Sequence, residues 1–292
     1  MKTTKLLILT ILISINTVSA QKNSVSDNPE AVERPSLELP RIQVIPIKDT
    51  ETGRQYELYI KLPEAYSEDN DTAYPVIYYT DAMWHVEILS GSAEYIMEEA
   101  ILVGISWQKD INDDLKKEVG EHVSRYRDYS IKKSSNPEHQ AKYQFGEASN
   151  HLDFIRNDII KYVENNYLTD ANKRSYFGYS MGGLFGAYIL LAQPDTFKNY
   201  ILGSPSLKGD ISFLSELESN EAIKRNGLNA NVFISYGSLE KELGEHAEEF
   251  VTLLKNRNDE SLSLHHEVIE GSHQTAFPMT AVRSMYWLSN NL

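Results

Sequence analysis

The stretch RSYFGYSMGGLFGAYILL, residues 174–191, decides the fold because its hydrophobic pattern changes on either side of a single serine. Its first half is a short aromatic run typical of a strand, and its second half has the small and apolar residues of a buried helix. Ser180 lies at the junction, with Gly178 two residues before it and Gly182 two residues after it. A sharp strand-to-helix turn strains the serine backbone and lifts its hydroxyl out of the sheet edge, and glycines let the two elements cross closely.

The rest of the chain predicts the sheet that carries this turn. Strand-like runs such as YPVIYYTD, AILVGIS, NYILGSP, NVFISYG and LHHEVIEG alternate with helical patterns such as HLDFIRNDIIKYVENNY. This alternation predicts a mainly parallel sheet with helices on both faces. RIQVIPIKD and QYELYIKLP flank the turn sequence TETGR and predict a hairpin at the edge of that sheet. The fold class is therefore α/β, and the serine turn makes it an α/β-hydrolase fold.

The N-terminus has the features of a secretory signal peptide. Residues 1–20, MKTTKLLILTILISINTVSA, combine two lysines, an apolar run and small residues before a predicted cleavage after Ala20. Thr10, Ser14 and Asn16 interrupt the run, which is thus too short for a helix that spans a bilayer. We expect export to the periplasm or the medium, with no stable membrane insertion after cleavage.

The net charge argues against a nucleic-acid partner, and the cysteine content excludes disulfide bonds. Removal of residues 1–20 takes Lys2 and Lys5 with it, so 26 of the 28 basic residues remain against 42 acidic ones, a net charge of −16. Such an acidic chain is not expected to bind nucleic acid. The chain has no cysteine, so disulfides are impossible and export carries no risk of mispairing.

The remaining chain is long enough for one large domain. Residues 21–40 are polar and contain prolines, which predicts a flexible lead-in, and residues 41–292 form the predicted hydrolase domain. Residues 107–149 have no sustained apolar period and follow a predicted strand. Because long connections in compact domains are usually lids or binding loops, we expect a lid-like excursion here.

A serine hydroxyl needs a base to remove its proton, and in α/β-hydrolases the order is serine, acid, histidine. Four histidines follow Ser180. His246 is in an acidic helical pattern, and His265 and His266 are inside the last predicted strand, whereas His273 comes just past that strand's end. His273 is therefore the predicted base.

Metal binding is not expected. His265 and His266 are adjacent in a strand, so they point to opposite faces and cannot chelate one ion together. The chain has no H-E-x-x-H or comparable spacing. We expect neither a metal nor a cofactor.

Five motifs in order, RYRDYS, LDFIRNDIIKYVENNY, GYSMGG, GSPSL and EGSH, resemble the esterase D-like group of α/β-hydrolases. The nearest branch is that of trilactone siderophore esterases and related predicted hydrolases, and the resemblance runs from about Ile42 to the end. It implies Ser180 as nucleophile and His273 as base. It also implies a small-molecule ester as substrate, which we expect to carry an aromatic or otherwise bulky acyl group.

The resulting prediction is an exported serine esterase that works through an acyl-enzyme. Two alternatives stay open at this stage. One is an acyltransferase on the same scaffold, and the other is a binding protein that has kept the fold without turnover. No motif is specific to a substrate, and the oligomeric state is not predicted.

The oxyanion hole needs two backbone N–H groups directed at the developing negative charge. One is expected from Met181, directly after the nucleophile. Where relatives carry His-Gly or Asp-Gly after the first parallel strand, this chain has Asp81-Ala82, which assigns the second N–H to Met83. Alanine in place of glycine is the departure that leaves open the backbone conformation of this loop.

The acid is expected where strand NVFISYG ends, beside the loop of the base. Glu240 stands three residues beyond Gly237, where feruloyl esterases place an aspartate after a similar glycine. Other carboxylates between Ser180 and His273 are less well placed, and some siderophore esterases are thought to use only a serine–histidine dyad. The competing carboxylates are Asp195, Asp210, Glu216, Glu218, Glu242, Glu245 and Asp259.

Three residues are candidates for substrate contact. Trp84 follows the oxyanion loop and either walls a pocket or belongs to the core. Arg125 and Arg127 lie in the long excursion, where they either bind an anionic or catecholate group or pair with neighbouring carboxylates.

Overall fold

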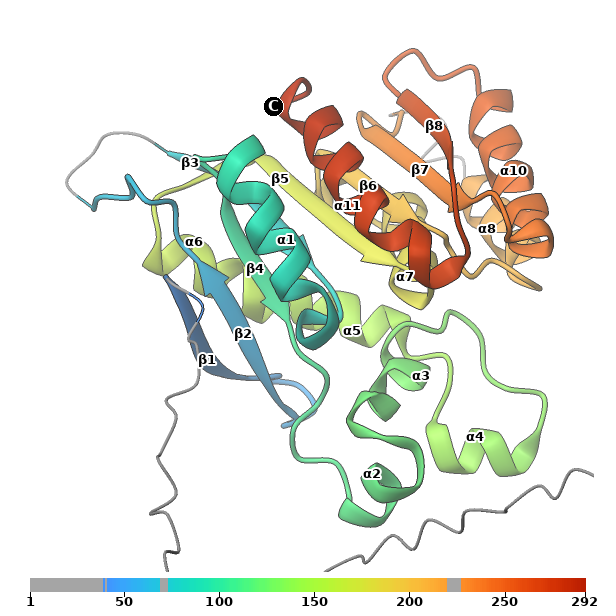
Figure 1. Ribbon diagram of the computed structural model, residues 1–292. Coiled ribbons are helices and arrows are strands. Elements are labelled where there is room, and N and C mark those ends of the chain that lie inside the picture. Colours follow the sequence, from blue (N-terminus) through green and yellow to red (C-terminus); the bar gives the residue numbers. More distant parts are fainter. Residues whose placement is uncertain (1–38, 40, 69–72, 220–226) are drawn as a thin grey trace, which may run out of the picture. The chain divides into compact units, whose positions relative to one another are not determined.

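The predicted strands form one eight-stranded sheet in the order β1-β2-β4-β3-β5-β6-β7-β8 (Figure 1). β2 runs antiparallel to both of its neighbours, β1 and β4, and every neighbouring pair from β4 to β8 is parallel. The mainly parallel sheet and the edge hairpin are therefore confirmed. The strands are β1 (Ile42–Lys48), β2 (Gln55–Lys61), β3 (Tyr74–Tyr79), β4 (Ile101–Ile105), β5 (Thr169–Tyr179), β6 (Asn199–Gly203), β7 (Asn231–Gly237) and β8 (Ser263–Ile269).

The computed structural model describes residue 39 and residues 41–68, 73–219 and 227–292. The predicted signal peptide and, apart from Leu39, the predicted lead-in lie outside these residues. Over the described ranges, no helix has both the length and the apolar character needed to cross a membrane.

Ten α-helices are described alongside the strands. They are α1 (Ala82–Ile96), α2 (Asp113–Val119), α3 (Arg125–Asp128), α4 (Pro137–Tyr143), α5 (Ala148–Phe154), α6 (Ile160–Asn166), α7 (Met181–Ala192), α8 (Ile211–Glu218), α10 (Lys241–Asn256) and α11 (His273–Ser289). Three short helical turns join them: η1 (Glu121–Ser124), the π-helical η2 (Ile155–Ile159) and η3 (Pro194–Thr196).

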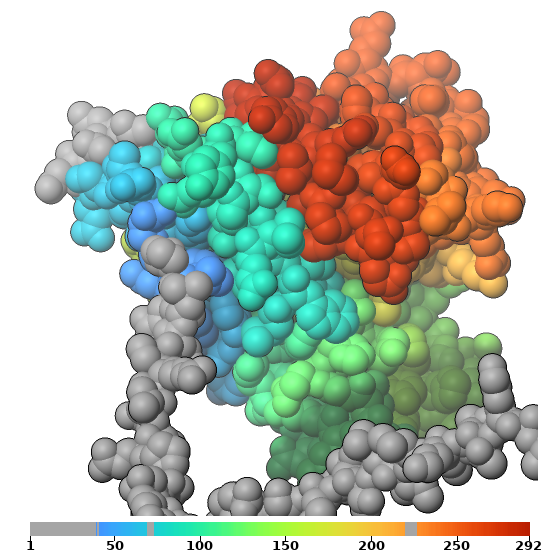
Figure 2. All heavy atoms as spheres, in the orientation of Figure 1, coloured from blue at the N-terminus to red at the C-terminus, as the bar shows by residue number. Residues whose placement is uncertain are grey.

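Helices cover both faces of the sheet because successive strand residues point to opposite sides. Val76 and Tyr78 of β3 pack in the larger apolar cluster with α5, α6, α7, α8 and α10. Ile77 and Tyr79 of the same strand pack in a second cluster with α1 and α11. These two helices lie side by side on their face, in teal and red (Figures 1 and 2).

The predicted helix HLDFIRNDIIKYVENNY is present, but its middle is the π-helical turn η2 between α5 and α6. Its predicted apolar face is buried, with every member at most 5% exposed: Leu152, Ile155, Ile159, Ile160 and Val163.

The segment 107–149 contains three short α-helices and η1, which the sequence pattern did not reveal. Asn112 and Asn136 start α2 and α4 because their side chains accept hydrogen bonds from the backbone N–H groups of the first turn. The middle of the segment is buried, and Tyr129 is only 1% exposed. Its function as a lid remains a prediction.

The carboxyl ends of the parallel strands meet at one edge of the sheet. Asp81 follows β3, Ser180 follows β5, Ser204 follows β6, Glu240 follows β7 and His273 follows β8. This edge is where open α/β sheets place their sites.

Candidate active site

Ser180 lies on a strained turn between β5 and α7, with φ 59° and ψ −119°. A Cβ atom on Gly178 would lie 2.2 Å from the carbonyl oxygen of Gly182. A Cβ atom on Gly182 would lie 2.4 Å from Thr80 Oγ1. A side chain at Gly178 would therefore push β5 and α7 apart, and one at Gly182 would push α7 away from the end of β3. These two contacts are the physical reason for the spacing of the motif.

The Ser180 hydroxyl has a neighbour that sequence reasoning did not predict. Its Oγ lies 3.2 Å from Ser206 Oγ, on the turn after β6. Among the hydrogen bonds of the described residues, none joins Ser180 Oγ to His273. Catalytic contacts are often long without substrate and shorten when it binds.

His273 is the first residue of α11, and its imidazole is hydrogen bonded to Glu240. The distance from His273 Nδ1 to Glu240 Oε1 is 2.5 Å. Ser272 begins this helix because its side chain caps the backbone N–H of Thr275. The Tyr179 hydroxyl donates a 2.7 Å hydrogen bond to the His273 carbonyl, which ties the start of α11 to the residue before Ser180.

Glu240 is held in place by donors from three directions. Its Oε2 accepts hydrogen bonds from the Gly237 N–H and from the Ser204 hydroxyl, each at 2.7 Å, and its Oε1 faces His273. A Cβ atom on Gly237 would lie 2.6 Å from the Gly271 carbonyl oxygen and 2.8 Å from Glu240 Oε2. Only glycine lets the acid and the loop of the histidine approach this closely.

The same donors keep Glu240 ionised. Burial raises the pKa of the Glu240 carboxyl, but the hydrogen bonds from His273, Ser204 and Gly237 outweigh burial and hold the pKa below its ordinary value. A charged carboxylate can only accept hydrogen bonds, so it directs the Nδ1–H of His273 toward itself.

The structure brings Glu240 to His273 and gives other candidate acids different partners. Glu242 pairs with Lys208 at 2.7 Å on the surface, and Asp210 lies 3.0 Å from Lys132. Three of the others also lie in ion pairs or hydrogen bonds away from His273: Asp195, Glu218 and Asp259.

Met181 and Met83 each lie in the first turn of a helix, where backbone N–H groups lack an intrahelical acceptor. Asp81 caps α1 in the left-handed conformation, with φ 58° and ψ 43°. Ala82 is already helical, so the alanine occupies a position that does not require glycine. The left-handed residue of this loop is the aspartate, and aspartate tolerates that conformation better than most residues. The loop can therefore make its turn with alanine in the place of glycine.

A buried ion pair supports Asp81 from the long excursion. Arg125 Nε and Nη2 lie 2.6 and 3.0 Å from the two carboxylate oxygens of Asp81, and Trp107 Nε1 donates to Oδ1 at 2.7 Å. Arg127 pairs with Asp128 and also donates to the Tyr56 hydroxyl.

Each of the two arginines therefore forms an ion pair with a carboxylate, which was one of the two roles expected for it. Arg125 and Arg127 are at most 9% exposed. Binding an anionic substrate group would compete with these buried ion pairs. The contact of both arginines with substrate stays a prediction.

Trp84 is not a core residue, since it is 50% exposed. Its ring packs edge-on against Trp107 at 4.7 Å, and the Arg125 guanidinium lies 4.8 Å from its centre. A pocket of about 350 Å³ adjoins this aromatic cluster and is lined by Met83, Ser106, Trp107, Gln108, Lys109, Lys116 and Glu121.

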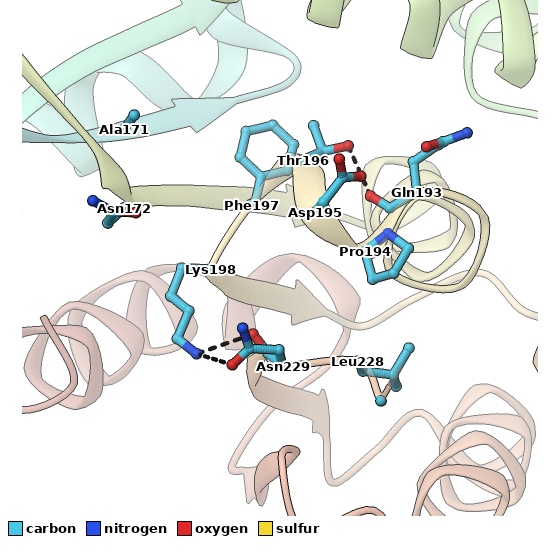
Figure 3. Close-up of a pocket in the computed structure, with 11 residues that line it drawn as sticks. Ala171, Asn172, Gln193, Pro194, Asp195, Thr196, Phe197, Lys198, Leu228 and Asn229 are labelled. Atoms are coloured by element: carbon cyan, nitrogen blue, oxygen red, sulfur yellow. Dashed lines mark hydrogen bonds between the residues drawn. The ribbon is translucent and has the colours of Figure 1, made fainter. Parts of the chain in front are cut away.

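A larger pocket, of about 760 Å³, lies at the amino ends of the parallel strands, opposite to the end that carries Ser180. Its lining residues include Asn172 near the start of β5, and Lys198 and Asn229 just before β6 and β7 (Figure 3). Lys198 points at Asn229 and donates to its side-chain and backbone oxygens. This pocket is at the amino ends of the strands, away from Ser180. Within the described ranges, no group of three or more His, Cys, Asp or Glu side chains could hold a metal ion.

Sequence reasoning missed the hydroxyl groups that contact the candidate site. Ser204, Ser206 and Tyr179 all hydrogen bond to one of its members. In the sequence, Tyr179 lies in the motif GYSMGG and the two serines lie in GSPSL, residues 203–207. Both motifs contributed to the family resemblance without a role for these three residues.

A strained serine between strand and helix, on a mainly parallel sheet covered on both faces, defines the class of α/β-hydrolases. Within that class, the chain belongs to the family described as putative esterase, whose sequence model matches residues 50–276.

The chain is also similar to proteins of known name or known structure. The chain is 25% identical over 240 residues to the ferri-bacillibactin esterase BesA of Bacillus subtilis (strain 168), which covers 75% of this chain and 78% of that one. It is also similar to the BES protein from Bacillus cereus, with a TM-score of 0.73, 25% identity and coverage of 88% and 99%. An IroE-like serine hydrolase from Shewanella oneidensis has a TM-score of 0.71, with 20% identity and coverage of 86% and 80%.

These findings confirm the resemblance to the siderophore esterase branch. The chain is therefore an esterase, and the alternative of a binding protein without turnover is set aside.

Proposed function

We propose that Ser180, His273 and Glu240 hydrolyse a carboxylic ester through an acyl-enzyme. The observation that carries this proposal is the 2.5 Å contact between His273 Nδ1 and Glu240 Oε1, at the sheet edge where Ser180 sits on its strained turn. The contact leaves Nε2 of His273 as the ring nitrogen that can accept the proton of Ser180.

The first half of the reaction forms the acyl-enzyme. Ser180 Oγ attacks the ester carbonyl carbon while His273 Nε2 takes the hydroxyl proton. The tetrahedral intermediate then collapses, the bond from carbon to the alcohol oxygen breaks, and His273 gives its proton to the leaving alcohol. Glu240 stabilises the imidazolium that exists between these two steps.

The second half releases the acid. His273 removes a proton from water, and the resulting hydroxide attacks the acyl carbon. Ser180 Oγ leaves as the new intermediate collapses and recovers its proton from His273, so the enzyme is regenerated. In both halves, the N–H groups of Met181 and Met83 are proposed to stabilise the oxyanion, and the positive ends of α7 and α1 add to this effect.

The proposed substrate is a small-molecule ester with an aromatic or otherwise bulky acyl group. Trp84 offers an exposed aromatic face after the oxyanion loop, and the pocket beside Met83 adjoins it. A relative named ferri-bacillibactin esterase supports a siderophore ester in particular. We further propose that residues 1–20 direct export and that segment 107–149 borders the bound substrate.

A panel of p-nitrophenyl and siderophore esters tests the reaction and the substrate class together. Without added metal, the purified protein should hydrolyse the esters, and aryl or siderophore esters should exceed acetyl esters in kcat/KM. The Ser180→Ala variant should lose activity and keep its circular dichroism spectrum. Comparable activity in Ser180→Ala contradicts the assignment, and a preference for acetyl esters contradicts only the substrate class. Product analysis with added alcohols separates hydrolysis from acyl transfer.

A further inference from the structure

One turn of the structure contacts both the candidate nucleophile and the candidate acid. It comprises residues 203–206 and follows β6, which lies between β5 and β7 in the sheet. The Gly203 carbonyl accepts a 2.9 Å hydrogen bond from the Ser180 N–H, and the Ser206 N–H donates to the Ser180 carbonyl at 3.1 Å. The turn therefore supports the strained backbone of Ser180 on both sides.

The two serines of this turn have different partners. Ser204 Oγ donates to Glu240 Oε2 at 2.7 Å and also lies 2.9 Å from the Tyr179 hydroxyl, whereas Ser206 Oγ lies 3.2 Å from Ser180 Oγ. Ser204 is fully buried in a left-handed conformation, with φ 37°. Its N–H donates to the Ser235 carbonyl at 2.7 Å, which fixes the backbone from which the hydroxyl reaches the acid.

The geometry gives the Ser204 hydroxyl a specific role. Glu240 has one more rotatable bond than an aspartate, so its carboxylate needs more contacts to stay in one orientation. One oxygen faces His273, and the other accepts from Ser204 and the Gly237 N–H. Loss of either donor would let the carboxylate rotate and weaken its hold on the imidazole.

We propose that Ser204 is a positioning residue for ester hydrolysis, whose hydroxyl fixes the orientation of the Glu240 carboxylate. Ser206, on the same turn, acts on the Ser180 hydroxyl and not on the acid. This inference rests on the proposed function, because it assigns Ser204 a role through Glu240 and His273.

The pH dependence of the reaction reports on this role. The titratable groups that face Glu240 are His273 on α11 and Tyr179 on β5, and the exposed Lys208–Glu242 ion pair lies at the start of α10. Burial raises the pKa of Tyr179 to about 12, so Tyr179 does not titrate near neutral pH. The pKa of Glu240 is the one that its donors lower, so the acidic limb of kcat/KM is the part of the profile that reports on them.

The direction of the expected shift follows from the charges. The donors of Glu240 lower its pKa, so the removal of one donor raises it and protonates the acid at a higher pH. This change moves the acidic limb of kcat/KM to higher pH, by roughly half a unit for one hydrogen bond.

The test compares Ser204→Ala and Ser204→Gly with Ser206→Ala as the matched control on the same turn. The two Ser204 variants should lower kcat about ten- to a hundredfold, leave KM nearly unchanged and shift the acidic limb upward. Glycine suits the left-handed backbone, so Ser204→Gly separates loss of the hydroxyl from backbone strain and replaces Ser204→Ala if that variant does not fold. Ser206→Ala should leave the acidic limb at its wild-type pH.

Two results would overturn the role of Ser204. One is a wild-type kcat and pH profile in the Ser204 variants, and the other is an equal shift of the limb in Ser206→Ala. Ser180→Ala and His273→Ala are assayed in parallel. If these two keep activity, the proposed function itself fails; if they lose it while the Ser204 variants do not, only the role of Ser204 fails.

Discussion

Two regions flank Ser180 at the edge of the sheet, and they are built in opposite ways. On the side of β7 and β8, neutral donors hold Glu240, and the side chain of His273 is 34% exposed. On the side of β3, the Asp81 carboxylate is 1% exposed and forms an ion pair with Arg125. One carboxylate thus faces a group that titrates, and the other faces a guanidinium that stays charged.

This difference matches the proposed functions of the two regions, which are proton transfer on one side and a fixed oxyanion loop on the other. A base must gain and lose a proton in every cycle, so His273 needs a partner that accepts both of its states. An oxyanion loop must keep its N–H groups still, and a buried ion pair fixes Asp81 without taking part in proton transfer. Variants on the first side should therefore lose rate, whereas variants on the second side should lose stability.

The largest effect is expected from His273→Ala. Without the imidazole, nothing removes the Ser180 proton, and kcat should fall by roughly 10⁵- to 10⁶-fold. The side chain is partly exposed, so thermal unfolding should stay close to wild type. Steady-state kinetics and circular dichroism measure the two effects, and more than about a hundredth of wild-type kcat would exclude His273 as the base.

A smaller loss is expected from Glu240→Gln. The amide neither stabilises the imidazolium nor fixes its tautomer, so kcat should fall by roughly 10²- to 10⁴-fold, with slow reaction toward a fluorophosphonate still measurable. Glu242→Gln, two residues on and exposed, is the matched control and should behave as wild type. If Glu242→Gln lowers kcat and Glu240→Gln does not, the acid is misassigned. If neither variant lowers kcat, the site is a serine–histidine dyad.

Arg125→Ala tests the other side of the comparison through stability. The substitution leaves the Asp81 carboxylate buried without its cation, which should cost about 3 to 5 kcal/mol in the free energy of unfolding. Urea unfolding measures this cost, and Arg125→Lys should restore part of it. Unchanged stability together with a higher KM for anionic esters would instead return Arg125 to the substrate site.

The smallest effect is expected from Tyr179→Phe. The change removes the hydroxyl that donates to the His273 carbonyl and lies 2.9 Å from Ser204 Oγ, two neutral hydrogen bonds worth about 1 kcal/mol each. We expect a loss of a few-fold in kcat with no change of fold. A loss as large as that of Glu240→Gln would mean that Tyr179 acts on the acid directly.

Much of this comparison could be predicted from local sequence. The motif around Ser180 predicts the strained turn without knowledge of the fold, because Gly178 has a steric cause within a few residues, although Gly182 meets Thr80 from another strand. His273 and Glu240 each follow a strand, and strand order alone places them at one edge. Because such features depend on neighbours in sequence, the pattern shows them.

The buried contacts could not be predicted in the same way. Arg125 meets Asp81 across 44 positions, and only the folded excursion brings them together. Ser204 and Ser206 look alike in GSPSL, yet one faces the acid and the other the nucleophile, since the turn after β6 directs them apart. The π-helical turn η2 likewise could not be predicted, because the spacing of apolar residues in the sequence is the same as in a continuous α-helix.

The proposed mechanism depends most directly on the identity of the nucleophile. Purified protein treated with a fluorophosphonate, digested and mapped by mass spectrometry should carry a single adduct on Ser180, and Ser180→Ala should carry none. Ser206 provides an internal control, because its hydroxyl lies only 3.2 Å from that of Ser180 and has no paired acid and histidine of its own. An adduct on Ser206, or equal labelling of Ser180→Ala, would contradict the assignment.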